Sequence, residues 1–256
     1  MPRRILLVAV MAAAAVAVPS AAQGATLERF DGLSRTLLLT GAPSETNLIT
    51  VEGSNSLVIT DDNMPLELRR IPGCMPLDAH AVGCAGYKRI ALDLNDGPDV
   101  ATIATSREVW LTGGAGNDTY NALGTSKPSH VDFDGGFGVD TASYFYAAEG
   151  VRVGVDGMPF DGRPGDDDRI DRDVERVIGS QSADVLTGAE RDQQLFGADG
   201  DDRIAGGPGQ DVLDGGDGND SIDAVDGELD TIDCGGWLLD QVMADPVEAS
   251  IVGCAG

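Results

Sequence analysis

Aspartate recurs at a fixed spacing between residues 179 and 223, always in the same local setting. Cut every nine residues, the stretch reads GSQSADVLT, GAERDQQLF, GADGDDRIA, GGPGQDVLD and GGDGNDSID. Position one is always glycine, and position eight is always leucine or isoleucine. Position six is Asp184, Gln193, Asp202, Asp211 and Asp220 in turn. Carboxylates repeated beside a glycine-rich backbone form an oxygen-rich ligand set, which suits a hard cation such as calcium.

The elements that position these carboxylates follow from the same period. Six glycine-rich residues form a tight turn, because glycine reaches positive φ without a steric penalty. The next three residues form a short strand whose middle residue, position eight, points inward. Two units make one rung, so units 18 residues apart stack with their strands roughly 4.8 Å apart. We therefore expect Asp184, Asp202 and Asp220 on one edge of the stack, and Gln193 with Asp211 on the other.

These units resemble the hemolysin-type calcium-binding (RTX) repeats of secreted bacterial proteins. The resemblance is specific for the last three units and weaker for the first two, where Ser182 and Arg191 replace the glycine of position four. It implies an all-β fold, a right-handed parallel β-roll or β-helix solenoid with an irregular β N-terminal part. It also implies Ca²⁺ bound by position-six carboxylates and turn carbonyls, here Asp184, Asp202, Asp211, Asp220, Gly197, Gly200, Gly206, Gly209, Gly215 and Gly218.

Two further turns of this kind lie upstream and add Asp118 and Asp140 as predicted ligands. They are 22 residues apart rather than 18, so we expect an insertion near Ser126–Ser129 to bulge out. Residues 95–99 form a first, degenerate turn. In the second nonapeptide, neutral Gln193 and the bulky Arg191 predict a weak or empty site.

Two other interpretations fit the residues of the repeat less well. A disordered glycine- and aspartate-rich linker has such a composition, but it would not keep glycine, aspartate and aliphatic residues in register over five units. An EF-hand loop begins like Asp217-Gly218-Asn219, yet the glycine it requires at loop position six is Ile222 here.

The rest of the chain divides by composition. Residues 1–25 are typical of a secretory signal peptide, with Arg3 and Arg4 before the apolar run 5–18. We expect an irregular β cap or small β domain over 26–94, a first calcium-repeat block over 95–143 and a β connector over 144–178. The RTX repeat block spans 179–242 and a C-terminal cap spans 243–256. In the connector, Asp166–Asp168 is a candidate cation site, but a solvated loop is the favoured interpretation.

The four cysteines allow three disulfide pairings. Pairing within each region, Cys74 with Cys84 and Cys234 with Cys254, is favoured because the two pairs lie far apart in the chain. Zinc is the competing use, but the sequence has no C-x-x-C and neither histidine has a suitable spacing.

Charge and motifs limit the function. The chain has 17 basic and 43 acidic residues, a net charge of −26, which disfavours binding to nucleic acid or anionic lipid. No later segment is long enough to span a membrane, and common catalytic motifs are missing from the sequence. We expect a non-enzymatic calcium-binding solenoid, secreted or at the cell surface, with a structural or interaction role and an unknown protein or glycan partner. The alternatives are a β-helix polysaccharide lyase or epimerase and, third, a secreted toxin. The lyase or epimerase would need arginine or lysine beside aspartate on one sheet face, with Arg152, Arg169 and Arg176 as its best candidates.

Overall fold

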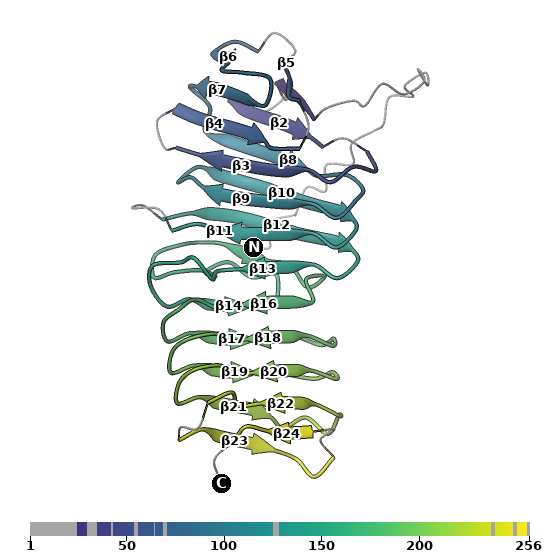
Figure 1. Ribbon diagram of the computed structural model, residues 1–256, viewed down its shortest axis with the longest axis vertical. Coiled ribbons are helices and arrows are strands. Elements are labelled where there is room, and N and C mark those ends of the chain that lie inside the picture. The colour runs from purple at the N-terminus through teal and green to yellow at the C-terminus, as the bar shows by residue number, and fades with distance from the viewer. Residues whose placement is uncertain are drawn as a thin grey trace, which may run out of the picture.

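The computed structural model describes residues 25–29, 35–41, 43–53, 56–63, 65–68, 71–124, 128–236, 239–247 and 250–254. These residues form strands β1 to β24 and no helix, stacked as the rungs of a long solenoid (Figure 1). The described part of the chain therefore holds no helix long and apolar enough to cross a membrane. The predicted signal peptide, apart from Ala25, and residues 125–127 of the predicted insertion lie outside the described residues.

One sheet, here called the long sheet, runs the length of the stack (Figure 1). It contains β3 (Leu48–Glu52), β4 (Ser56–Asp61), β6 (Cys74–Pro76), β7 (Ala81–Ala85), β9 (Val100–Ala104), β11 (Thr119–Ala122), β13 (Thr141–Ser143), β16 (Arg176–Ile178), β18 (Gln194–Phe196), β20 (Val212–Asp214), β22 (Thr231–Asp233) and β24 (Ser250–Val252).

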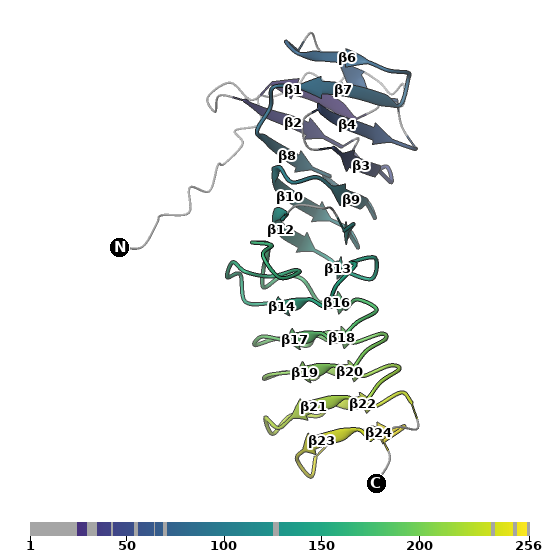
Figure 2. The ribbon, with the colours of Figure 1, turned by 90° about the vertical axis from the view of Figure 1, so that its left-hand side faces the viewer.

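Two shorter sheets lie opposite the long sheet, one after the other along the stack (Figure 2). The N-terminal sheet contains β1 (Thr26–Arg29), β2 (Thr36–Thr40), β5 (Glu67–Leu68), β8 (Arg89–Asp93), β10 (Glu108–Ala115), β12 (His130–Phe137) and β15 (Arg169–Ile170). The C-terminal sheet contains β14 (Arg152–Gly154), β17 (Val185–Thr187), β19 (Arg203–Ala205), β21 (Ser221–Ala224) and β23 (Gln241–Ala244). The change from one to the other takes place at the connector.

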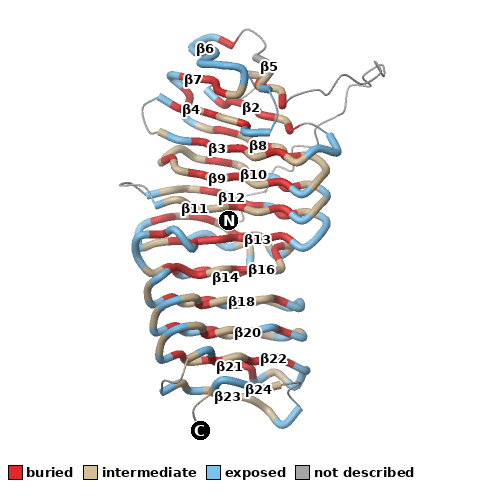
Figure 3. The backbone as a smooth tube through the Cα atoms, in the orientation of Figure 1, coloured by how far each residue is buried: buried red, intermediate tan, exposed pale blue. Residues whose placement is uncertain are grey.

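From β16 to β21 the rungs repeat every 18 residues, as the sequence predicts, and the later pairings have offsets of 19 and 20 residues. Leu186 pairs with Ile204 and Ile204 with Ile222 in the C-terminal sheet, while Leu195 pairs with Leu213 in the long sheet. All five side chains are at most 1% exposed. Each three-residue strand sends only its middle residue inward, so this half has a thin aliphatic core, and its rungs in Figure 3 alternate short buried segments with intermediate and exposed ones.

In the N-terminal half, the rungs are wider because the strands are longer. β10 and β12 each span eight residues and pair in parallel with a 22-residue offset, from Glu108 opposite His130 onward. Each sends two residues of its strand into the core, for example Val131 and Phe133 of β12. The preceding rung pairs with a 19-residue offset, with Arg89 opposite Glu108 and Val100 opposite Thr119, so the three additional residues lie between β11 and β12, where the sequence predicts an insertion.

Both ends of the stack are tied by disulfides. β2 and β3 continue the two sheets in parallel with β8 and β9, and antiparallel β4, β7 and β6 follow at the N-terminal end. Cys74–Cys84 links β6 to β7, and Cys234–Cys254 links the segments after β22 and β24. Both predicted pairings are confirmed, and with all four cysteines oxidised none is a zinc ligand. β24 extends the long sheet by one strand, and its Ile251 is 48% exposed at the end of the core.

Candidate metal-binding turns

The position-six carboxylates form hydrogen-bonded columns along the two edges of the stack. Beside the C-terminal sheet, the backbone N–H of Asp184 donates to Oδ1 of Asp202 at 2.7 Å, and that of Asp202 donates to Oδ1 of Asp220 at 2.8 Å. Beside the long sheet, the N–H of Asp99 donates to Asp118 at 2.9 Å and that of Asp118 to Asp140 at 2.8 Å. One carboxylate oxygen of each of these residues thus accepts a hydrogen bond from the backbone of the preceding rung.

The other carboxylate oxygen, Oδ2, is buried and accepts no hydrogen bond in a set of described turns that we call the open turns. Their aspartates are at most 1% exposed. The open turns are residues 94–99, 113–118, 135–140, 197–202, 206–211 and 215–220, ending at Asp99, Asp118, Asp140, Asp202, Asp211 and Asp220. A buried acceptor without a donor is costly, so these oxygens mark places where the protein alone leaves a bond unmade.

A second acceptor faces the same point in several open turns. A Cβ added at Gly197 would meet both Oδ2 of Asp202 and the carbonyl oxygen of Gly215 in the next rung. The same holds at Gly113, which faces Asp118 and the carbonyl of Gly135. Two oxygens converge on a space that only a glycine leaves open, with no donor between them. A cation fits this arrangement, because it would be attracted to both oxygens.

The backbone of the open turns explains the glycine pairs in the sequence. Position two is left-handed in every open turn, at Asn95, Gly114, Gly136, Ala198, Gly207 and Gly216, with φ between 79° and 105°. Glycine adopts this conformation freely, and asparagine does so more readily than most other residues. At position four, a Cβ on Gly218 would collide with the backbone carbonyl of Gly200 in the rung before it, so glycine is also required for close stacking.

Burial makes these carboxylates hard to ionise. Desolvation raises the pKa of Asp202 to about 7, and the nearby acids Asp184 and Asp220 raise it further, although the Asp184 N–H lowers it. Desolvation likewise raises the pKa of Asp211 to about 7 and the pKa values of Asp118 and Asp140 to about 6. A cation bound at Oδ2 would favour the ionised forms and offset this cost.

Two of the predicted repeat turns are arranged differently. Asp184 accepts the N–H of Ser180 at Oδ2, at 2.5 Å, and the Ser180 hydroxyl at Oδ1, at 2.8 Å. Gln193 accepts the N–H of Ala189 at Oε1, at 2.9 Å. Both acceptors therefore have a protein donor, and we call residues 179–184 and 188–193 the closed turns.

The remaining predicted residues lie where the repeat places them. Gly197, Gly206 and Gly215 occupy position one, and Gly200, Gly209 and Gly218 occupy position four of open turns. The sequence reasoning missed Asp99 as a candidate ligand, because Leu94 stands where the repeat has glycine. Its signal was Asn95 with Gly97, which supply the left-handed residues of the turn at φ 79° and 124°.

The candidate ligand set is not a cluster of side chains. Within the described ranges, no three His, Cys, Asp or Glu side chains gather closely enough to hold a metal ion. A cation in an open turn would therefore take backbone carbonyls as well as the carboxylate. Calcium is suited to this mixture, since it accepts six to eight oxygen ligands of either kind.

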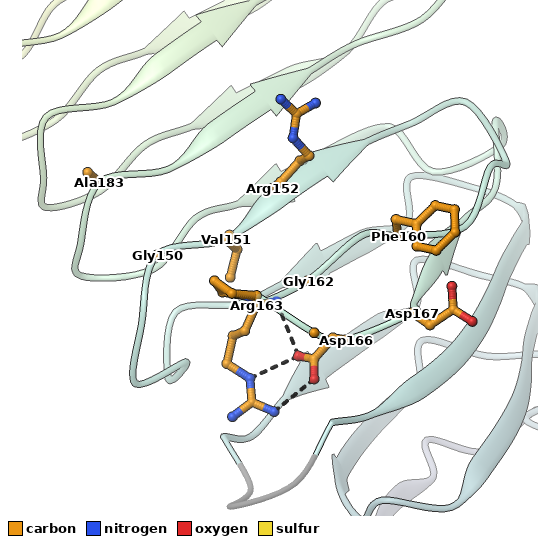
Figure 4. Close-up of a pocket in the computed structure, with 11 residues that line it drawn as sticks. Gly150, Val151, Arg152, Phe160, Gly162, Arg163, Asp166, Asp167 and Ala183 are labelled. Carbon is orange, nitrogen blue, oxygen red and sulfur yellow. Dashed lines mark hydrogen bonds and ion pairs between the residues drawn. The ribbon is translucent and has the colours of Figure 1, made fainter.

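In the connector, the prediction of a solvated loop over Asp166–Asp168 is wrong for Asp166 and Asp168. Asp166 is not solvated, since its carboxylate accepts hydrogen bonds from the Arg163 guanidinium at 2.9 and 3.2 Å and borders a cavity of about 660 Å³ (Figure 4). Asp168 is fully buried, and its Oδ2 accepts the hydroxyls of Tyr120 and Tyr144, both at 3.3 Å. Only Asp167 keeps a half-exposed side chain.

Comparison with known proteins agrees with this geometry. The family model of the RTX calcium-binding nonapeptide repeat matches residues 104–124 and 196–228, in four copies. These ranges contain the open turns 113–118, 197–202, 206–211 and 215–220, and they omit both closed turns. No curated protein matches the chain. The chain is therefore an all-β protein that carries RTX calcium-binding nonapeptide repeats.

Proposed function

We propose that the chain is a secreted, non-enzymatic solenoid that folds and stiffens when Ca²⁺ occupies its open turns, and that it serves an extracellular structural or interaction role. The observation that carries this proposal is the set of buried Oδ2 atoms without a donor, which includes those of Asp118, Asp202 and Asp220. In these three turns the oxygen shares its space with a backbone carbonyl of the next rung.

Electrostatics supports the coupling between calcium and folding. The chain has a net charge of −26, and stacking brings ionisable aspartates together in columns, so the compact state repels itself. Bound Ca²⁺ would reduce this repulsion and complete the unmade contacts at the same time. Because the unfolded chain has no such turns, the free energy of binding adds to the free energy of folding.

Export agrees with the same proposal. Residues 1–25 have the composition of a secretory signal, and both disulfides belong to an oxidising compartment. Calcium is scarce in the cytoplasm and abundant outside the cell, so a calcium-dependent solenoid would complete its folding after export.

Thermal unfolding followed by far-UV circular dichroism tests this function. We expect the mature chain in EGTA to lose β structure and to melt at a markedly lower temperature than in millimolar Ca²⁺. Magnesium at the same concentration is the control, because its rigid octahedral geometry suits these turns poorly. Identical melting curves in EGTA and in calcium would refute the proposal.

The alternative of a polysaccharide lyase or epimerase needs basic and acidic groups together on one sheet face. The three arginines singled out in the sequence are divided, with Arg152 on β14, Arg169 on β15 and Arg176 on β16, in three different sheets. Arg169 forms an ion pair, since its guanidinium lies 3.4 Å from Asp132. A screen for depolymerisation or epimerisation of acidic polysaccharides tests this alternative, with Arg169→Ala as the control for any activity found.

A further inference from the structure

In the closed turns, the acceptor oxygen that the open turns leave without a donor receives one from within the chain, although Nε2 of Gln193 is buried without a hydrogen-bond partner. In the open turn 197–202, Oδ2 of Asp202 has no donor. In the closed turn 179–184, the equivalent oxygen of Asp184 accepts the N–H of Ser180, and the Ser180 hydroxyl binds the other oxygen. In the closed turn 188–193, the N–H of Ala189 donates to Oε1 of Gln193, and the Gln193 side chain carries no charge.

The difference comes from one backbone residue. Position two has positive φ in every open turn, whereas Ser180 and Ala189 do not. With ordinary φ, the N–H of position two donates to the side chain of position six, four residues later. Ser180 fixes its turn further, since the N–H of Ser182 donates to its hydroxyl at 3.1 Å. This donor therefore binds the acceptor oxygen that the open turns leave without one.

A third turn also supplies a donor from within the chain, in this case a side-chain amide. Asn47 precedes β3 as Asp99 precedes β9, and the side-chain Nδ2 of Asn47 donates to the carbonyl oxygen of Leu94 at 3.2 Å and to Oδ1 of Asp99 at 2.8 Å. An amide here supplies a donor toward the carbonyl of the next rung. At Gly113, Gly197 and Gly215 of the open turns, the corresponding carbonyl oxygen lies beside a carboxylate oxygen.

The closed turns belong to one rung in the C-terminal half of the stack. They precede β17 and β18, whose rung lies between that of β14 and β16 and that of β19 and β20 (Figure 2). We infer that these two turns fold without calcium and divide the calcium-dependent turns into two blocks, residues 94–140 and 197–220. This inference rests on the proposed function and specifies where along the solenoid calcium acts.

Hydrogen exchange on the full mature chain, in EGTA and in calcium, tests the division. We expect amides of residues 180–196 to keep most of their protection in EGTA, while amides of residues 199–222 exchange faster by at least an order of magnitude. Equal loss of protection in both segments would overturn the inference. A chain that shows no response to calcium anywhere would instead refute the proposed function.

Opening a closed turn gives a second, independent test. Ser180→Gly combined with Ser182→Gly converts GSQSAD into GGQGAD, a complete repeat turn with the carboxylate of Asp184 in place. We expect calorimetry to detect one additional Ca²⁺ per chain and the melting temperature in EGTA to fall. Ala79→Gly, at an exposed position outside both kinds of turn, is the control and should leave the stoichiometry unchanged. An unchanged stoichiometry in the double variant would overturn the inference, and if that variant fails to fold, hydrogen exchange on the wild type decides.

Discussion

Replacing Asp202 with asparagine should change stability in opposite directions with and without calcium. Asp202 keeps its Oδ1 bond to the preceding rung, and Oδ2 is the oxygen without a donor. In Asp202→Asn, an amide nitrogen at the Oδ2 position can donate to the carbonyl of Gly215, as Asn47 donates to Leu94. We therefore expect the variant to be more stable than the wild type in EGTA and less stable in calcium.

The size of the gain in EGTA follows from the raised pKa. Because the pKa of Asp202 rises from 3.8 to about 7 on folding, the folded state favours the protonated carboxyl and the ionised form opposes folding. The stability that the protonated form contributes is fully present below the ordinary pKa and is lost as the pH rises through 7. At about pH 8 the full shift corresponds to roughly 4 kcal/mol, which solvent screening reduces to about 1–2 kcal/mol. The melting temperature should then rise by roughly 2–8 °C.

In calcium the sign reverses, because the variant replaces a charged ligand with a neutral one. A loss of affinity of roughly tenfold removes about 1.4 kcal/mol of calcium-dependent stability at a fixed free calcium concentration. Melting curves of both proteins in both buffers measure the two effects. Asp199→Asn, an exposed position in the same turn, is the control for the change in net charge. A shift of the same sign in EGTA and in calcium would refute the reasoning about Oδ2.

Three other variants test separate parts of the structure. Ala198→Gly relieves a left-handed alanine with φ 81°, so urea unfolding should show a gain of about 1 kcal/mol with or without calcium, and a loss would contradict the strain. Gly218→Ala places a Cβ against the carbonyl of Gly200 and should cost about 3 kcal/mol or more, so a melting temperature equal to the wild type would show that the rungs are not this close. Burial raises the pKa of Asp168 to about 7, so in calcium the wild type should lose stability as the pH rises from about 5 to about 8, and Asp168→Asn should flatten this slope. If the stability of the two proteins depends on pH in the same way, the titrating group is not Asp168.

The thin half of the solenoid could be predicted from the sequence because its register is determined locally. Each nonapeptide supplies one inward aliphatic residue and one glycine at fixed positions, so the pairing of Leu186 with Ile204 follows from counting. The disulfides were also predictable, since each pair lies within one short region of the chain.

The residues of the candidate site could be predicted from the sequence, but which turns are open and which are closed could not. Asp184 and Asp202 occupy the same position of the repeat, yet one carboxylate is satisfied by Ser180 and the other is not. The cause is the backbone conformation of position two, and alanine stands there both in the open turn of Ala198 and in the closed turn of Ala189. Residue type alone therefore does not determine which turns are open.

The connector could not be predicted because its partners come from distant parts of the chain. Three consecutive aspartates, 166–168, are typical of a solvated loop. In the structure the hydroxyls of Tyr120 and Tyr144 point to Asp168, and the N–H of Val131 donates to it at 2.9 Å. These contacts span 24 to 48 residues, and no local pattern in the acidic run indicates them.

A crystal structure of the mature chain grown in calcium would test the central claim most directly. We predict a bound ion in each open turn of the repeat block, in contact with Oδ2 of the aspartate and, at Asp202, with the carbonyl of Gly215. At Asp184 we predict no ion, with the hydrogen bonds from Ser180 unchanged. Open turns without an ion, or an ion at Asp184 that displaces Ser180, would contradict the account.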